Sequence, residues 1–216
     1  MKDKKIDFSI EKPKLPIDLE GIEAIGQLED ESYISSGVIG GYIIENQVAD
    51  AVTFNEVIFK NSAFIGSSLN YAELTDVRFE HCDLSNVDFR NSIIHRVEFV
   101  NCKVMGINLS ESTLRNVRFN QCSGDYGFFS FADCKAVKFQ DCELCYSDFQ
   151  DCNFNKVGFY NTDLTQCQMS GTKLKDIDFT SCNVDGIGAR IDNLRGAIFS
   201  PVQAVSLSKL MGIIIR

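Results

Sequence analysis

A large apolar residue recurs at every fifth position through most of this chain. From Phe54 to Phe199, thirty consecutive positions follow this spacing without an insertion, and only Gly124 has no side chain to bury. The residue two places earlier is small or β-branched almost throughout, with Asp192 as the one charged exception. The remaining positions of each unit are mostly polar. Because an internal repeat decides the architecture of a chain that contains one, this period constrains the fold more than any other feature.

A period of five fits neither the 3.6-residue period of an α-helix nor the two-residue period of a long strand. Residues two places apart point to the same side of an extended chain. Each unit is therefore predicted to be a short extended segment whose large residue, and the residue two before it, point inward. A corner that faces water follows each segment. Repetition of segment and corner winds the chain into a solenoid.

A second period sets the number of corners in one turn, because phenylalanine occupies every fourth large position. This column consists of Phe59, Phe79, Phe99, Phe119, Phe139, Phe159, Phe179 and Phe199. The repeat of 20 residues predicts four sides per turn, with phenyl rings stacked along one wall. Adjacent turns are expected to lie about 4.8 Å apart, as neighbouring strands do. Ile34, Ile39 and Ile44 keep the same frame, so the coil is expected to begin near residue 32.

The chain contains nine cysteines, and the repeat frame explains most of them. Eight fall on inward positions, where cysteine acts as a small buried hydrophobic residue. Cys142 and Cys145 form a CxxC motif, a spacing used for zinc and redox chemistry. The frame places Cys142 inside and Cys145 outside, so the two cannot easily converge on one metal. We therefore predict no metal site.

No catalytic site or cofactor site is predicted. The two histidines, His81 and His95, fall on outward positions, and the frame places no serine or cysteine nucleophile beside either. The acidic residues between Asp141 and Asp151 lie on a convex rod, where nothing would desolvate them or raise a pKa. The pattern therefore favours a protein that is not an enzyme.

The formal net charge of −9 argues against nucleic acid as a direct partner, because phosphate binding needs a basic stripe. An acidic surface can instead meet a protein that normally binds DNA.

No stretch approaches 18 consecutive apolar residues, so no membrane span is predicted. The first residues, MKDKKIDFSIEKPKLP, lack the apolar region of a signal peptide, and a cytoplasmic location is expected.

The segment CSGDYGFFSF is the most irregular part of the repeat. Gly124 vacates an inward position, while Tyr126, Phe128 and Phe131 fall on outward positions. Tyr146 follows Tyr126 one turn later in the same column. Exposed aromatic residues often mark a partner surface, which makes these four the candidate contact residues. The alternative is a local bulge that swings Phe128 inward to fill the gap at Gly124.

The repeat resembles the bacterial pentapeptide-repeat family, whose motif is A(D/N)Lxx with Leu or Phe at the centre. Segments that match this motif include CDLSNVDFRN (82–91), CNFNKVGFYN (152–161) and TDLTQCQMSG (162–171). The match covers roughly residues 52–201. The resemblance implies an all-β fold, a right-handed quadrilateral β-helix, which we place over residues 34–200.

The tail, SPVQAVSLSKLMGIIIR, resembles one branch of that family. It is similar to the ending of the Qnr and MfpA type, whose members protect DNA gyrase from quinolones. In that type a C-terminal helix and strand cap the coil and form an end-to-end homodimer. The resemblance therefore implies a homodimer through residues 201–216 and DNA gyrase as a candidate partner. The expected cap and dimer residues are Pro201, Val202, Ala204, Leu207, Leu210, Met211, Ile213 and Ile215.

Local chemistry predicts a helix in this tail independently of the resemblance. Ser200 can cap it, Pro201 suits its first position, and Gln203 completes a capping box. Gly212 is a good end for the helix, before a short strand over residues 213–215. The residues expected to share its apolar face are Ala204, Leu207 and Met211.

Residues 1–33 lie outside the repeat frame. Leu19, Ile22 and Leu28, within an acidic stretch, would suit a short capping helix. A solenoid end exposes strand edges and needs a cap. The two interpretations that remain open are such a cap and a flexible acidic tail with a binding role.

For the whole chain we predict a non-enzymatic protein-binding surface, with DNA gyrase or topoisomerase as candidate partner. The alternative is a structural or regulatory scaffold with an unknown partner. No cofactor and no membrane contact are expected.

Overall fold

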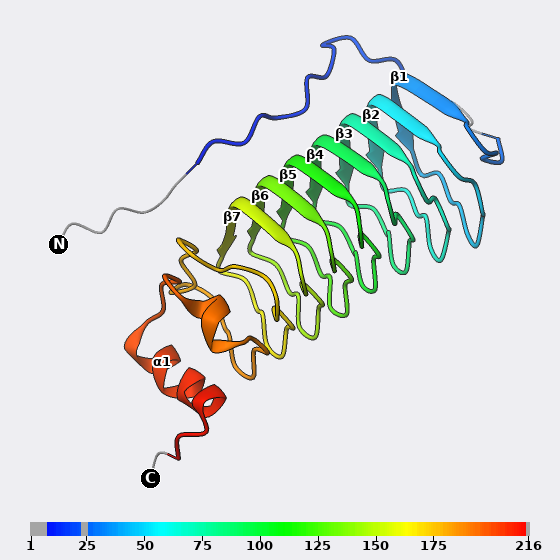
Figure 1. The fold of residues 1–216 in the computed structure, drawn as a ribbon. Helices are drawn as coiled ribbons and strands as arrows, with labels where there is room; N and C mark the ends of the chain where they lie inside the picture. The colour runs from blue at the N-terminus through cyan, green and yellow to red at the C-terminus, as the bar shows by residue number, and fades with distance from the viewer. Residues whose placement is uncertain (1–7, 23–25, 215–216) are drawn as a thin grey trace.

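The computed structural model describes residues 8–22 and 26–214, most of which form a parallel β-solenoid (Figure 1). Seven strands form one sheet in sequence order. They are β1 (Tyr33–Gly40), β2 (Thr53–Lys60), β3 (Glu73–Glu80), β4 (Ile93–Val100), β5 (Thr113–Asn120), β6 (Asp133–Gln140) and β7 (Asn153–Tyr160). Each strand pairs with the strand one turn later, so that Tyr33 lies beside Thr53 and Asp133 beside Asn153. The predicted 20-residue turn is confirmed.

Each turn has four corners. Each strand covers two of the four walls and bends at the corner between them, for example at Glu56, whose φ is 56°. The other two walls are narrower and are joined by single bridges such as Ala63 with Asp83. Every fifth residue from Glu31 to Asp176 has a positive φ, and these residues form the corners. The predicted quadrilateral β-helix is confirmed, and its first strand, β1, begins at Tyr33.

The interior is filled by the residues that the repeat frame predicted. Every large position from Phe54 to Val184 is buried, except for Phe154, which is half-buried. The phenylalanine column is stacked, with the ring centroids of Phe59 and Phe79 5.0 Å apart and their planes 9° from parallel. Offset-stacked rings at such distances attract each other beyond the area that they bury. The eight cysteines expected inside are buried, and Cys145 is only partly covered.

The frame is interrupted near Asp192, the charged exception in the sequence, and resumes by Phe199, whose ring stacks on Phe179 with 5.1 Å between centroids. A short 3-10 helix, η1 (Ile191–Leu194), replaces the extended segment there, and Asp192 is exposed. A charged side chain at an inward position would have to be desolvated without a partner. The chain therefore leaves the coil geometry at Asp192 and returns to it at Ile198, which pairs with Asp178 of the preceding turn.

Helix α1 (Pro201–Leu207) begins as predicted. The Ser200 side chain accepts a hydrogen bond from the Gln203 backbone, and the Gln203 side chain accepts one from the Ser200 N–H at 2.7 Å. A 3-10 turn, η2 (Ser208–Met211), continues the helix, and Gly212 ends it in the left-handed conformation. In the described part of the chain, no helix has the length and apolar character needed to cross a membrane.

The packing face of this helix differs from the prediction. Leu207 packs against the core, but Ala204 and Met211 are exposed. The reason is that Gln203 turns toward the coil, where its side chain donates to the carbonyl of Phe179 at 2.8 Å. The polar capping residue thus decides which side of the helix faces inward.

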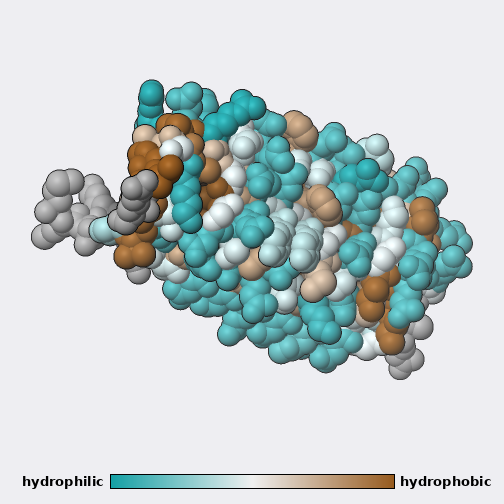
Figure 2. All heavy atoms as spheres, turned by 90° about the horizontal axis from the view of Figure 1, so that it is seen from below, coloured by the Kyte–Doolittle hydropathy of each residue, from teal (hydrophilic) through white to brown (hydrophobic). Residues whose placement is uncertain are grey.

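The end of the rod is apolar. The predicted strand does not form at Ile213 and Ile214, which are exposed, and Ile215 lies outside the described residues. Figure 2 shows apolar side chains gathered at the end of the molecule that carries α1, while most of the visible face between the two ends is hydrophilic.

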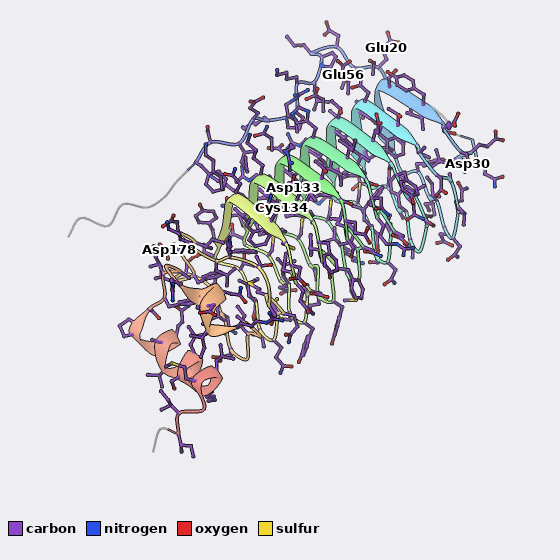
Figure 3. All side chains as sticks on the ribbon, in the orientation of Figure 1. Glu20, Asp30, Glu56, Asp133, Cys134 and Asp178 are labelled. Carbon is purple, nitrogen blue, oxygen red and sulfur yellow. The ribbon has the colours of Figure 1, made fainter. Side chains whose placement is uncertain are left out.

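Residues 8–22 are extended and run back along the outside of the coil, from β1 toward β7; we call them the strap (Figure 1). Glu20 lies over β1, where its carbonyl accepts a hydrogen bond from Val38 at 2.9 Å (Figure 3). Further along, the Lys14 N–H donates to Asp76 Oδ1 at 2.7 Å. At the far end of the strap, the Phe8 ring lies 4.8 Å from Lys138 Nζ.

The capping helix expected around Leu19, Ile22 and Leu28 is wrong for the described residues. Leu19 and Ile22 belong to the strap, because the open edge of β1 offers backbone partners to an extended chain. Ile22 is half-buried against the core, whereas Leu28 is fully buried, and its N–H donates to Gln47 Oε1 at 3.0 Å across the first turn.

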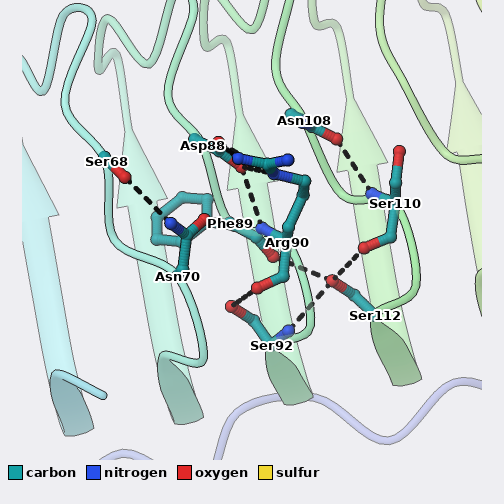
Figure 4. A network of polar contacts seen from close by, with 9 residues as sticks. All are labelled: Ser68, Asn70, Asp88, Phe89, Arg90, Ser92, Asn108, Ser110 and Ser112. Carbon is teal, nitrogen blue, oxygen red and sulfur yellow. Dashed lines mark hydrogen bonds and ion pairs between the residues drawn. The ribbon is translucent and has the colours of Figure 1, made fainter. Parts of the chain in front are cut away.

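Small polar side chains connect successive turns (Figure 4). The Ser92 N–H donates to the Ser112 hydroxyl at 3.1 Å, and that hydroxyl donates to the Phe89 carbonyl at 2.8 Å. On the outer surface, Asp88 accepts a hydrogen bond from the Arg90 backbone two residues later. Such local bonds are typical of Asp at turns, and they satisfy backbone groups at the corners.

Candidate partner-binding surface

Four aromatic side chains project from two adjacent turns of the coil. The exposed fractions of Tyr126, Phe128, Phe131 and Tyr146 are 53%, 48%, 61% and 47%. The rings of Tyr126 and Tyr146 stack, with centroids 5.1 Å apart and planes 6° from parallel. Tyr126 and Phe131 occupy two successive corners, and Phe128 lies on the wall between them. We call these four residues the aromatic surface.

The alternative of a bulge that buries Phe128 is wrong. The Phe128 N–H donates to the Ile107 carbonyl at 2.8 Å, so the regular register is kept. The space at Gly124 is already taken by its column neighbours. A Cβ added to Gly124 would lie 2.7 Å from Val104 Cγ2 and 3.0 Å from Leu144 Cδ2. No vacancy remains to draw Phe128 inward, and its ring stays at the surface.

Carboxylates border the aromatic surface. Asp148 pairs with Phe128 in the ladder, while Glu111 and Asp151 lie one turn before and one turn after Phe131. None of these three carboxylates takes part in an ion pair within the described residues. An aromatic centre with an acidic border complements a partner patch that combines apolar side chains with Arg or Lys.

The CxxC motif is divided as the frame predicted. Cys142 is buried and Cys145 faces the surface. Burial, with Asp125 and Asp163 nearby, raises the pKa of Cys145 to about 11. Its thiol is therefore protonated at neutral pH and is a weak nucleophile and metal ligand. Among the residues that the structure describes, no group of three or more His, Cys, Asp or Glu side chains could hold a metal ion.

Both histidines lie on outward positions. His81 is exposed, and His95 contacts the Arg96 guanidinium, with 3.0 Å between Nε2 and Nη1. Partial burial, followed by the charge of Arg96, lowers the pKa of His95. Within the described ranges, no serine or cysteine side chain hydrogen-bonds to either ring.

The predicted cap and dimer residues fall into two sets. Leu207 is half-buried against the core, and Leu210 is also half-buried. Those exposed at the end of the rod are Pro201, Val202, Ala204, Met211 and Ile213. Ile215 lies outside the described residues. Sequence reasoning missed Val205 and Ile214, which are also exposed; their apolar character was the available signal.

Two family models match the coil. One, described as a pentapeptide repeat region, matches residues 72–149. The other, described as pentapeptide repeats in eight copies, matches residues 132–171. The chain is a pentapeptide-repeat protein. No curated protein matches its sequence at a significant level.

Solved structures resemble this pentapeptide-repeat protein at low sequence identity. HetL from the cyanobacterium Nostoc sp. strain PCC 7120, involved in heterocyst differentiation regulation, is 16% identical with a TM-score of 0.52 and covers 80% of this chain and 87% of its own. A trypsin-treated form of QnrB1, a plasmid-mediated fluoroquinolone resistance protein, is 22% identical with a TM-score of 0.47, over 89% of this chain and 100% of its own. The likeness to HetL shows a shared fold.

Proposed function

We propose that this pentapeptide-repeat protein is a non-enzymatic binding module whose aromatic surface contacts another protein. The observation that carries the proposal is the exposure of Tyr126, Phe128, Phe131 and Tyr146 on two adjacent turns. Tyrosine and phenylalanine are enriched in the centres of protein interfaces, where they bury large areas. The aromatic surface occupies corners and a convex wall, without the cleft that would desolvate catalytic groups.

DNA gyrase is the first candidate partner. A net charge of −9 and the carboxylates beside the aromatic surface would complement a protein whose own surface binds DNA. The C-terminal sequence, which resembles the Qnr and MfpA type, also favours gyrase. All nine cysteines are free, in keeping with the reducing cytoplasm where such a partner is found.

A scaffold for a different partner is the second candidate. The coil is unbroken from β1 to the last turn, and no loop projects from the described walls to reach into a partner. Several charged side chains pair along the walls, such as Arg78 with Glu80 at 2.8 Å. These pairs make the rod a regular surface rather than a strongly acidic one.

A gyrase supercoiling assay, with and without a quinolone, tests the first candidate. We expect the wild-type protein to change supercoiling or its inhibition by the drug. The variant Y126S/F128S/F131S/Y146S should need at least about tenfold more protein for the same effect, because the aromatic contacts are lost. The matched control I43S/V48S/Y71S removes exposed apolar side chains from other turns and should behave as wild type.

Two outcomes would contradict this proposal in different ways. Equal effects of both variants would show that gyrase is contacted elsewhere on the rod. No effect of the wild-type protein would remove gyrase and leave the scaffold role.

We also propose that the apolar end of the rod associates with a second copy of the chain. Val202 and Ile214 are among its most exposed apolar residues. Contiguous apolar surface of this kind is typical of an interaction site. A symmetric end-to-end dimer would bury the same patch on both copies.

A further inference from the structure

The strand wall of the coil opens after β7. Strands β2 to β6 each pair on both edges, but β7 pairs only with β6. In the described part of the chain, no backbone hydrogen bond joins β7 to residues 173–180, the segment one turn later. On a narrow wall at the same level, the ladder continues, and Asp163 pairs with Asn183. The last turn therefore stays in place while one of its walls separates.

The side chain of Asp178 explains this separation (Figure 3). Its Oδ1 accepts hydrogen bonds from the Thr180 N–H at 2.9 Å and from the Thr180 hydroxyl at 2.6 Å. The same bonds join Asp163 to Thr165 on a narrow wall. Local side-chain bonds of this type compete with strand pairing. Residues 173–180 thus adopt the narrow-wall geometry, which does not match the extended β7.

A groove of about 820 Å³ lies at the opening. It is lined by β7, by residues of the separated segment and by Phe8 of the strap. Gly158 pairs with Lys138 of the preceding strand, and the Tyr160 ring lies over the position where a Gly158 side chain would project. Phe154, a large inward residue that is only half-buried, also lines the groove. The volume falls within the range of ligand sites, roughly 300–1,000 Å³.

The open edge of β7 carries backbone groups without partners. The N–H groups of Phe154 and Lys156 have no hydrogen-bond partner among the described residues. Just beyond the strand, the Asn161 N–H donates to the Ser181 hydroxyl at 3.2 Å, not to a backbone carbonyl of the next turn. An open edge of this kind is a template for an added strand, since main-chain hydrogen bonds supply affinity and side-chain pockets supply specificity.

The groove carries more positive than negative side chains, although the protein is acidic. Lys138, Lys156 and Lys175 line it, against Asp176 and Asp178. Neither Lys156 nor Lys175 takes part in an ion pair within the described residues. Carboxylates on an occupant would therefore find cationic partners there.

We propose that this groove binds an extended acidic peptide segment of a partner protein, by strand addition to β7. The peptide backbone would pair with the open edge, alternate apolar side chains would contact Phe154, and carboxylates would meet Lys156 and Lys175. The site is separate from the aromatic surface, and its peptide test does not depend on gyrase.

Titration of the full-length protein with synthetic peptides tests this inference. The probe is an acetylated and amidated pentapeptide of alternating glutamate and valine. Binding is expected to saturate and to shift the backbone NMR signals of residues 154–158. A peptide with lysine in place of glutamate should bind at least about tenfold more weakly, because like charges meet. A glutamate peptide with N-methylated valines keeps its charge but loses backbone donors, and its binding should be abolished.

Variants of the protein provide the second arm. K156E/K175E should weaken binding of the glutamate peptide at least about tenfold, whereas K135E, an exposed lysine on β6, should leave it unchanged. D178V removes the local bonds to Thr180, so residues 173–180 should pair with β7, exclude the peptide and slow amide exchange at Phe154. The inference is overturned by equal affinity for the N-methylated peptide, by unchanged affinity in K156E/K175E, or by no saturable binding at millimolar peptide.

Discussion

Phe119 shows what one inward side chain contributes to this coil. Its ring lies between those of Phe99 and Phe139, at centroid distances of 4.5 and 4.9 Å. The ring of Phe129 meets it edge-on from another wall. Because each turn touches only its neighbours, a lost ring leaves a cavity that the rigid backbone ladder cannot close.

The variant F119A is expected to lower the free energy of unfolding by roughly 3–5 kcal/mol, the usual cost of a buried Phe-to-Ala cavity. The matched control F128A removes the same atoms from the surface and should cost less than about 1 kcal/mol. Chemical denaturation of both variants measures the difference. A loss below about 1 kcal/mol for F119A would mean that the ring is not enclosed.

Corner residues show how the coil overrides local preference. Tyr126 and Phe131 have φ values of 61° and 62°, a region that side chains other than Gly, Asn and Asp seldom adopt. The Tyr126 N–H donates to the Cys145 carbonyl of the next turn at 2.9 Å. Hydrogen bonds between turns hold the corner, so bulky aromatic residues are tolerated there and are left facing solvent.

At the scale of elements, the strap depends on one carboxylate. Asp76 accepts hydrogen bonds from Arg96 Nε and Nη2, each at 2.6 Å, and from the Lys14 N–H. Burial alone would raise the pKa of Asp76, but the bonds from Arg96 and Lys14 outweigh it and lower the pKa below its ordinary value of 3.8. The strap is thereby tied to the coil through a charged group.

The sign of this shift gives a pH dependence. Since the pKa of Asp76 is lower in the folded state than in the unfolded chain, its stabilisation is present above pH 3.8 and is lost as pH falls through the lower folded value. The Lys14 amide signal should therefore move toward its unstructured position only below pH 3.8. D76N should show the same change at neutral pH, at a cost of about 1.5–3 kcal/mol for bonds to a charged group.

A matched variant controls this experiment. D83N alters a carboxylate that pairs with Lys103 on a different wall, 3.6 Å away, and should leave the Lys14 signal in place. A Lys14 signal that is unchanged in D76N would show that the strap is held by its other contacts.

At the scale of the whole molecule, the two ends of the rod differ. At the first turn, the strap pairs with β1 and Leu28 fills the core, although Ile43 and Val48 stay exposed on the outer walls. At the other end, α1 and the residues after it leave a group of apolar side chains exposed. A solenoid without a polar terminal cap tends to associate through its end. This asymmetry motivates the proposed dimer.

Light scattering at micromolar concentration is expected to give the mass of a dimer, and V202D/I214D to give a monomer, because buried unpaired carboxylates oppose the contact. The control V48D introduces the same charge at Val48, which is exposed near the other end, and this variant protein should remain a dimer. A wild-type monomer whose mass is the same in V202D/I214D would exclude association through this end.

The pattern of residues along the chain was enough to predict the frame of the fold. The five-residue spacing fixed which side chains face inward, and the spacing of Phe59 and Phe79 fixed the length of a turn. Ser200 and Gln203 fixed the start of the helix. These features rest on residues that recur every five or every 20 positions and on two capping residues three positions apart, so the sequence pattern shows them directly.

Three features became evident only in the folded structure: the path of the strap, the filling of the space at Gly124 and the opening beside β7. The strap bonds Glu11 to Asn116 across 105 residues, and Gly124 is closed by side chains from the turns on either side. The opening beside β7 arises because residues 173–180 have the backbone geometry of a narrow wall, which does not match the extended strand β7. Each outcome depends on groups that are distant in sequence or on a comparison between neighbouring walls, and no local pattern carries that information.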